Sequence, residues 1–498
     1  MAMKIKPGPR GNSRPEVNLV WIKRDLRTQD HASFHRAESA GLPYIPIYIF
    51  DQRLLGHPDV SERHLAFIRA SIKDMNVVLS PLGKTIREFY GDSLTVFKWL
   101  NESFLIKNVW SYQESGIALS WDRDKAVREF FVENHIEWTE FQQNGVQRGR
   151  KNRKDWIKNW YMTMAEPLIV NSFSPQEDPI ETKALDLALF DWPIDLVPKN
   201  NPPEMQPGGQ TKARHYLMTF GKERGANYAR FISKPHKSRM HCSRLSPYIS
   251  WGNLSIRQVY QYLKHHQNYR HHKRAFNAML VRLRWHCHFI QKFEMECTYE
   301  TKCINQGFEL MQHDNNEELL LAWKTGMTGI PIVDANMRAL KATGWINFRM
   351  RALLVSFLAH HLDQDWRKGV YHLAQLFLDY DPGIHYPQFQ MQAGTTGVNT
   401  IRMYNPVKNS KEHDPEGEFL KKWLPELAHV PIEFIHAPWE MSELEQTMYD
   451  LNIGRDYPKP VVDVIGSAQV ARKKIWSFRK RPEVQKEKKK ILNRHVIQ

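Results

Sequence analysis

The sequence predicts an α/β N-terminal domain with a parallel, Rossmann-like sheet, followed by a C-terminal half that is all-helical. Three short apolar runs, 17–21, 44–50 and 109–112, are typical of buried strands, and a helical stretch over 122–134 follows the last of them. Strands and helices in alternation indicate a parallel sheet. After residue 210 strand signals nearly vanish. Apolar residues recur there at helical spacing in 276–295, 317–323, 349–362 and 370–378.

The carboxyl end of a strand is the usual ligand edge of a parallel sheet. Tyr112, Gln113 and Glu114 lie at that end of the 109–112 strand. They are therefore candidates for contacting a ligand, although Glu114 is equally well explained as an ordinary surface acid. No GxGxxG or GxxxxGK[ST] motif follows the first strand, so the sequence of this domain lacks the usual backbone phosphate cradles.

Composition divides the chain into five segments. Residues 1–15 are basic and rich in Pro, Gly and Ser, and we expect a disordered leader. The α/β domain occupies 16–145, a Pro-rich connector with some helix occupies 146–210, and the helical domain occupies 211–465. Residues 466–498 are strongly basic. We expect a solvated tail there, with contact to nucleic acid as the alternative.

The charge balance favours a polyanionic partner. Seventy Lys and Arg face 54 Asp and Glu among 498 residues, which gives a formal net charge of +16. Cations that neutralise phosphates release condensed counterions, so such a surplus suits nucleic acid. No apolar run approaches the roughly 20 residues of a membrane-spanning helix, and the N-terminus lacks the apolar core of a secretory signal. We expect a protein that is neither secreted nor in a membrane, located in the cytoplasm, the nucleoid or the nucleus.

The four cysteines predict neither a metal site nor a disulfide framework. Cys287, Cys297 and Cys303 are nine and five residues apart, and Cys242 lies far upstream. No pair has CxxC or zinc-like spacing, so reduced thiols are expected.

Four blocks in order resemble the photolyase/cryptochrome superfamily. They are VNLVWIKRDLRTQDH at 17–31, CSRLSPYISWGNLS at 242–255, AWKTGMTGIPIVDANMRALKATGWINFRMR at 322–351 and NPVKNSKEHDPEGEFLKKWLPEL at 405–427. The resemblance implies an antenna-type α/β domain joined to a helical FAD-binding domain. It also implies FAD as cofactor and, in some relatives, a second antenna chromophore of the folate or deazaflavin type.

The resemblance assigns one segment to the FAD phosphates. Ser243, Arg244, Leu245 and Ser246 match it, and hydroxyls with free N–H groups at a helix start suit an anion. The plainer interpretation is a capped helix with a surface Arg. Tyr228 lies where the family has a Tyr that contacts FAD.

Further residues match the surroundings of the flavin ring. Arg351 and Asp379 match a buried ion pair, Asp381 matches an acid near the flavin edge and ribitol, and Trp345 falls in the same helical region as Arg351. A cation there stabilises a reduced, anionic flavin. An ordinary interdomain salt bridge is the alternative.

Trp285 matches the Trp that stacks against an extruded lesion. Arg282, Trp285 and Phe289 share one helix face, and an aromatic with a cation suits a flipped base pair that carries a phosphate. A buried amphipathic face is equally consistent with this spacing.

Several positions depart from the family pattern. Arg282 stands where many dimer-repairing photolyases carry Glu, and Arg accepts no hydrogen bond. His385 stands where an Asn usually faces flavin N5, so it would tune the flavin or donate a proton, or be a structural replacement. Met391 replaces the second aromatic that often sandwiches the lesion.

The usual tryptophan chain for photoreduction is also incomplete. Phe389 occupies the position next to the flavin, Trp366 retains the middle one, and the outer one falls near His313, where there is no Trp. Tyr380, Tyr386 and Tyr404 are candidates for another route.

The leading hypothesis is a monomeric DNA photolyase that repairs pyrimidine dimers in UV-damaged DNA by electron transfer from reduced FAD. The lesion type stays open between a cyclobutane dimer and a (6-4) photoproduct. Loss of the Glu argues against the first, and His385, with His286 and His360, would suit the second. The rivals are a cryptochrome photoreceptor without repair activity and a nucleic-acid-binding protein that has lost the flavin.

Overall fold

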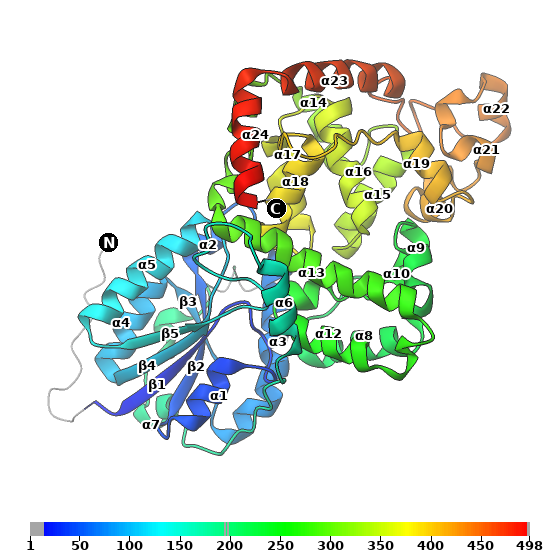
Figure 1. The fold of residues 1–498 in the computed structure, drawn as a ribbon. Coiled ribbons are helices and arrows are strands. Elements are labelled where there is room, and N and C mark those ends of the chain that lie inside the picture. The colour runs from blue at the N-terminus through cyan, green and yellow to red at the C-terminus, as the bar shows by residue number, and fades with distance from the viewer. Residues whose placement is uncertain (1–13, 194–195, 197–198, 496–498) are drawn as a thin grey trace.

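The computed structural model describes residues 14–193, 196 and 199–495. A five-stranded sheet forms the core of the N-terminal region, and all of its strands are parallel, in the order β3-β2-β1-β4-β5 (Figure 1). The strands are β1 Glu16–Ile22, β2 Tyr44–Asp51, β3 Arg87–Gly91, β4 Leu105–Tyr112 and β5 Glu137–Phe141. The predicted α/β class with a parallel sheet is confirmed. Most of the predicted leader lies outside the described residues.

Helices cover both faces of this sheet because its central strands alternate between two cores. In β1, Leu19 and Trp21 pack into one apolar cluster with α4 and α5, while Val20 and Ile22 pack into another with α1 and α3. The helices that connect the strands are α1 Ala32–Ser39, α2 Gln52–Leu55, α3 Glu62–Leu79, α4 Ser93–Ser103 and α5 Ala118–Glu133, with a 3-10 turn, η1, at Ser80–Leu82.

The strands at 17–21, 44–50 and 109–112 are confirmed as parts of β1, β2 and β4. β3 and β5 were not predicted. They are five-residue strands at the two edges of the sheet, and the sequence EWTEF of β5 contains no fully buried residue. Edge strands are half solvated and lack a continuous apolar run, so their signal in the sequence is weak.

The connector is mostly irregular and contains α6 Trp156–Ala165, α7 Pro179–Lys183 and η2 Leu187–Phe190. The remaining described residues are almost entirely helical. Their helices before the long α13 are α8 Gln210–Lys222, η4 Arg224–Asn227, α9 Tyr228–Phe231, α10 Pro235–His241, α11 Ser246–Ser250, α12 Ile256–His265 and η5 Gln267–Tyr269.

From α13 onward most elements contribute to one large apolar cluster, which α13 itself joins only through Phe293. In chain order the elements are α13 Lys273–Met295, η6 Cys297–Glu300, η7 Gln306–Leu310, α14 Glu317–Thr325, α15 Pro331–Thr343, α16 Phe348–Ser356, η8 Phe357–His361, α17 Trp366–Leu376, α18 Pro382–Ala393, α19 Pro406–His413, α20 Glu418–Trp423, η9 Pro425–Leu427, α21 Ile432–Ile435, η10 Pro438–Glu440, α22 Glu443–Met448, α23 Val464–Arg479 and α24 Pro482–His495. All four predicted helical stretches coincide with helices, and none of the described helices is long and apolar enough to cross a membrane.

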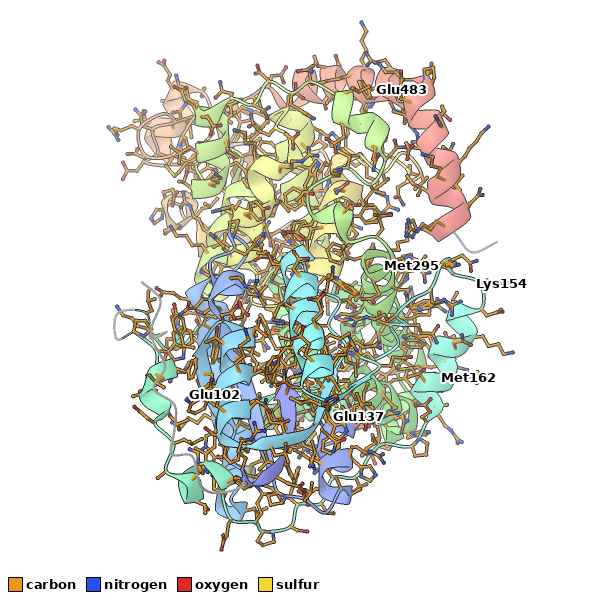
Figure 2. The ribbon with its side chains drawn as sticks, turned by 90° about the vertical axis from the view of Figure 1, so that its left-hand side faces the viewer. Glu102, Glu137, Lys154, Met162, Met295 and Glu483 are labelled. Atoms are coloured by element: carbon orange, nitrogen blue, oxygen red, sulfur yellow. The ribbon has the colours of Figure 1, made fainter. Side chains whose placement is uncertain are left out.

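The prediction of a solvated C-terminal tail was wrong. Up to residue 495 this segment forms most of α23 and all of α24, which pack along the helical half; in Figure 2 Glu483 marks the start of α24 and Met295 the end of α13. Ile475 and Phe478 of α23 and Ile491 of α24 are buried. These apolar residues recur at helical spacing, but the many lysines and arginines between them dominate the composition.

The two halves are joined at the segment 375–380, which links α17 to α18. Its six consecutive backbone carbonyls each accept a hydrogen bond, of 2.8 to 3.1 Å, from a side chain outside the segment. In order along the segment the donors are Ser61 Oγ, Arg63 Nη1, His64 Nε2, Trp251 Nε1, Ser250 Oγ and Arg24 Nη1. Carbonyls at a helix end have no partner within the helix, so these donors satisfy groups that burial would otherwise penalise.

A buried acid strengthens the same junction. Asp59, which precedes α3, accepts a hydrogen bond from the Tyr380 hydroxyl and lies 2.7 Å from His57 Nδ1. His57 in turn approaches Glu300 at 3.3 Å. Burial lowers the pKa of His57, but the two carboxylates outweigh burial and raise it to about 9. Through His57 and Asp59 the α/β region therefore contacts Glu300 and Tyr380 of the helical half.

We expect Ile475→Ala to loosen α23. Ile475 is 3% exposed, and truncation of a buried Ile to Ala costs about 2–5 kcal/mol. Amide hydrogen exchange along α23 should report a matching fall in the free energy of local opening. Val470→Ala on the same helix is the control, because Val470 is 69% exposed and should change that free energy by less than about 0.5 kcal/mol. Equal exchange in both variants would contradict the packed position of α23.

Candidate functional site

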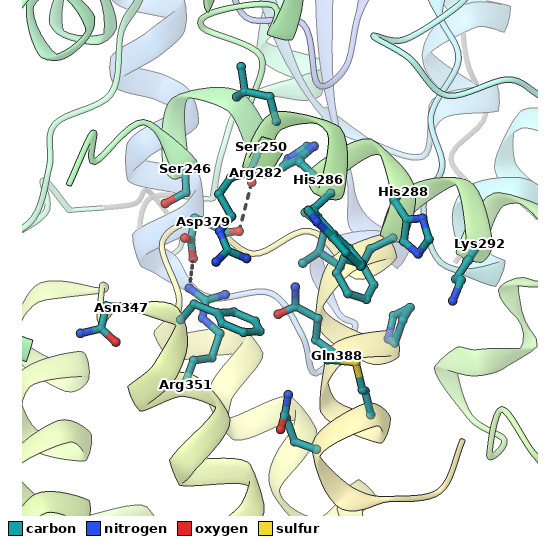
Figure 3. Close-up of a pocket in the computed structure, with 18 of the residues that line it drawn as sticks. Ser246, Ser250, Arg282, His286, His288, Lys292, Asn347, Arg351, Asp379 and Gln388 are labelled. Carbon is teal, nitrogen blue, oxygen red and sulfur yellow. Dashed lines mark hydrogen bonds and ion pairs between the residues drawn. The ribbon is translucent and has the colours of Figure 1, made fainter. Parts of the chain in front are cut away.

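A cavity of about 690 Å³ lies within the helical half. Its walls come from α13, the start of α16, α18, the 242–250 segment, the 396–402 loop and the end of α24. Figure 3 shows Ser246, Arg351 and Asp379 towards one end and His288 and Lys292 at the other. Among the described residues, every side chain that lines it is numbered 228 or higher, so the α/β domain contributes none.

The segment predicted to hold phosphates lines one end of the cavity. Ser243, Arg244 and Ser246 reach it, and Tyr228 lies beside them, whereas Leu245 is fully buried and lines no part of it. α11 begins at Ser246, as expected, but it is only five residues long. The groups that this segment offers an anion are therefore its side chains, not the end of a long helix.

Arg244 is held flat against Trp345. Its guanidinium carbon lies 4.2 Å from the Trp345 ring centroid, and its Nε donates to Gln206 Oε1 at 3.0 Å. Its backbone has a φ of 59°, in the left-handed region that is unusual for a side chain this large. Burial, with repulsion from Arg239, lowers the pKa of Arg244 to about 10. The interpretation as a surface Arg is therefore wrong, because Arg244 is 7% exposed.

The predicted ion pair is present. Arg351 Nη2 donates to Asp379 Oδ1 at 2.7 Å, and both residues line the cavity. The Arg351 guanidinium also lies 3.5 Å from the Phe377 ring centroid. The backbone carbonyl of Asp379 accepts from Ser250, so the acid is fixed at both its main chain and its side chain.

Asp381 lies next to this cavity but not in its wall. Its carboxylate caps α18 by accepting from Gly383 N at 2.9 Å, and it lines a separate space of about 30 Å³ together with Arg24, Glu114 and His286. Burial raises the pKa of Asp381 to about 6.

The predicted lesion face is present on α13. Arg282, Trp285 and Phe289 all line the cavity, and Met391 faces it from α18. Trp285 is 43% exposed, which is unusual for so large an aromatic side chain. A flat, accessible ring at a cavity wall suits stacking, so the buried amphipathic face offered as the alternative includes Phe289 but not Trp285.

His385 does not reach the main cavity. It is 6% exposed, its Nε2 donates to the Val370 carbonyl at 2.9 Å, and burial lowers its pKa to about 4. Gln388, three residues after His385 on α18, lines the cavity, and the sequence did not lead us to predict it. The signal was available, because Gln388 and Met391 lie on one face of α18 at i, i+3.

Of the other two histidines proposed for the cavity, His286 lines it and His360 does not. Both ring nitrogens of His286 are buried without a hydrogen-bond partner among the described residues. His360 instead bonds the Gln392 carbonyl at 3.0 Å. Burial lowers the pKa of each of these two rings to about 4.

Several aromatic side chains considered for photoreduction lie around His385, whose ring centroid is 5.6 Å from that of Phe389. Phe389 and Trp366 are buried with ring centroids 6.4 Å apart, and His313 pairs with Asp363 at 3.2 Å. Tyr380 lies 5.3 Å from His385, ring to ring, and Tyr386 lies 5.8 Å from it.

Glu114 at the sheet edge is not a surface acid. Arg123 Nη2 lies 2.7 Å from its carboxylate, and Arg24 Nε lies 3.6 Å away. Burial by itself raises the pKa of Glu114, but Arg123, Lys23 and Arg24 outweigh burial and lower it. Gln113 lines the same small space, and the Tyr112 hydroxyl accepts from Ala32 N at 2.8 Å.

The residues of the main cavity fit a flavin dinucleotide. The volume lies within the range of cofactor pockets. Hydroxyls, Arg244 and the Arg351–Asp379 pair line it, as does His286, whose ring nitrogens have no hydrogen-bond partner among the described residues. Ser243, Arg244 and Ser246 would hold its phosphates, and Arg351 and Asp379 its ring.

Comparison with known proteins identifies the family of this chain. A family model described as the FAD-binding domain of DNA photolyase matches residues 279–477, and a DNA photolyase model matches residues 18–151. A deoxyribodipyrimidine photo-lyase of Alkalihalophilus pseudofirmus is 36% identical over 501 residues and covers 94% of this chain and 98% of its own. The chain therefore belongs to the photolyase/cryptochrome family and contains its FAD-binding domain.

The chain is also similar to proteins that are named cryptochromes. A cryptochrome DASH of Synechocystis sp. is 28% identical over 501 residues, covering 92% of this chain and 98% of its own. The crystal structure of a Synechocystis cryptochrome superimposes with a TM-score of 0.84 at 24% identity, covering 93% of this chain and 100% of that one. This likeness confirms the fold.

We expect Arg351→Gln to lower the flavin content of the purified protein. Removing one partner of a buried pair costs about 3–5 kcal/mol because it leaves the other charge uncompensated. The absorbance ratio of flavin to protein after gel filtration measures the loss. Arg338→Gln breaks a 2.7 Å pair with Glu426 away from the cavity and should leave that ratio unchanged. A full flavin complement in Arg351→Gln would contradict the role given to this pair.

Proposed function

We propose that this protein is a light-driven DNA photolyase that repairs pyrimidine dimers in UV-damaged DNA. The observation that carries the proposal is the continuity of one cavity, which connects the Arg351–Asp379 pair to the exposed face of Trp285. A flavin and an extruded base pair bound there would be in the same enclosed space. The net charge of +16 supports a nucleic-acid partner.

In this proposal the chain's own residues bind, orient and exclude water. Arg351, fixed by Asp379, would favour negative charge at the flavin, and Trp285 would stack on the extruded bases with Arg282 beside it. When bound and reduced, the flavin supplies the photoexcited electron that splits the dimer. His286, neutral and without a partner among the described residues, is one of the cavity histidines and would be available to a (6-4) lesion. A bound antenna chromophore and a monomeric state remain predictions.

The alternative is a cryptochrome photoreceptor without repair activity. The observation that favours it is the pair of unusual residues at the lesion end, Arg282 and Met391, both of which face the cavity. Neither accepts a strong hydrogen bond from a damaged base.

Light-dependent repair decides between these functions. The reduced protein would be incubated with one oligonucleotide that carries a cyclobutane dimer and another that carries a (6-4) lesion, in blue light and in darkness. We expect chromatography to show restoration of one of them in light only, and its identity names the lesion. No restoration of either, on single- or double-stranded DNA with FAD bound, would leave the cryptochrome as the function.

Trp285→Ala should weaken binding of the lesion-bearing oligonucleotide. Loss of base stacking costs about 1–3 kcal/mol, or roughly 5- to 150-fold in affinity. Fluorescence anisotropy measures the change. Trp476→Ala on α23 is the matched control, because Trp476 is 47% exposed but lies outside the cavity. The same affinity in both variants would remove Trp285 from the lesion site.

A further inference from the structure

The end of the cavity beyond Trp285 is surrounded by basic side chains that neither the flavin nor the lesion face accounts for. His288 and Lys292 line it from α13, one and two turns after Trp285, and His495 lines it from the end of α24. Figure 3 shows His288 and Lys292 on the side of the cavity away from Ser246. This end is therefore separate from the segment assigned to the flavin phosphates.

A buried arginine lies behind these residues. Arg153 is 1% exposed, and its Nη1 donates to His288 Nδ1 at 2.6 Å, while its guanidinium packs 4.2 Å from the Trp156 ring centroid. Its Nε and Nη2 atoms are buried and have no hydrogen-bond partner among the described residues. A buried guanidinium normally has a carboxylate beside it, and in the described part of the chain no acid lies within ion-pair distance of Arg153.

The hydrogen bond from Arg153 determines which ring nitrogen of His288 carries the proton. A guanidinium only donates, so Nδ1 of His288 must accept and the ring proton of the neutral imidazole resides on Nε2. Burial, together with Arg153 and Lys292, lowers the pKa of His288 to about 2, so the ring is neutral. His288 is thereby held as an N–H donor at Nε2.

No negative charge compensates this cluster within the described residues. Burial and then Arg153 lower the pKa of Lys292 to about 8, and the charges that act on His495 are those of Lys292, Arg494 and Arg153. The two nearest acids along the chain are already paired. Glu294 lies 2.8 Å from Arg148 Nε, and Glu296 pairs with Arg494.

α24 completes this end of the cavity. Tyr299 also lines this end, and its hydroxyl oxygen lies 2.6 Å from His495 Nε2. The Nδ1 atom of His495 is buried without a partner among the described residues. The basic C-terminal helices therefore contribute a wall residue to the cavity.

We propose that His288, Lys292 and His495 form a phosphate subsite, positioned by Arg153, that takes a backbone phosphodiester of the damaged strand. The proposal rests on the proposed function. The His288 ring centroid lies 4.9 Å from that of Trp285, so a base stacked on Trp285 brings its own backbone to this cluster. A stacking aromatic followed by N–H donors, one of them the charged Lys292 ammonium, suits the backbone of single-stranded nucleic acid. A bound phosphate supplies the missing negative charge.

Lys292→Gln tests the subsite against a matched control. Affinity for a single-stranded oligonucleotide that carries a cyclobutane dimer would be measured at several salt concentrations at pH 7. Loss of one phosphate contact should reduce the slope of log affinity against log salt by about 0.7. Lys98→Gln removes the same charge from the exposed surface of α4 and should leave the slope unchanged. Lys292 is partly exposed at the cavity wall, and equal melting temperatures of the variants confirm intact folding.

The outcomes distinguish the subsite from the proposed repair activity. An unchanged slope in Lys292→Gln overturns the subsite even in a protein that repairs DNA. A reduced slope in a protein that repairs neither lesion supports the subsite and rejects the repair. Inorganic phosphate separates the two sources of the anion. At constant ionic strength, inorganic phosphate could raise the melting temperature of the wild type but not that of Lys292→Gln. If the two proteins also show the same slope of oligonucleotide affinity against salt, the site takes a free anion and the assignment to DNA is wrong.

Discussion

The rest of the site depends on the 375–380 segment, whose six carbonyls accept hydrogen bonds from six side chains outside it. Because the main chain of Asp379 is fixed in this way, its carboxylate is held where it pairs with Arg351. The same segment sets the start of α18, which carries Gln388 and Met391 into the cavity. The α/β domain lines no part of the cavity among the described residues, yet through Arg24, Arg63 and His64 it holds the segment that carries Asp379.

Charge is distributed unevenly along the cavity. At the flavin end Arg351 has a carboxylate partner, and Arg244 is covered by Trp345. At the other end Arg153 and Lys292 have no acid beside them in the described part of the chain. A buried cation without a partner is costly, and a ligand that brings negative charge removes that cost. The cavity therefore suits a polyanion at the end that faces away from the flavin segment.

The sheet edge shows the opposite arrangement. Lys23 lies 3.0 Å from Asp124, and Arg123 lies 2.7 Å from both Asp124 and Glu114, so the charges of this crevice neutralise one another. Glu114, which sequence reasoning offered to a ligand at this edge, is thus held by partners from α5 and from the segment that follows β1.

The sequence by itself determined the α/β class and the helical second half, because apolar periodicity and ordered blocks are properties of short segments. It also pointed to most of the predicted site residues that the cavity brings together. It did not reveal β3 and β5, whose edge positions are half solvated, or the packing of α23, whose lysines and arginines mask a buried face. It also did not reveal which face of α18 reaches the cavity, so His385 was expected there and Gln388 was not. Only the tertiary structure brings Arg153, Lys292 and His495 together, since no local pattern relates residues so far apart in the chain.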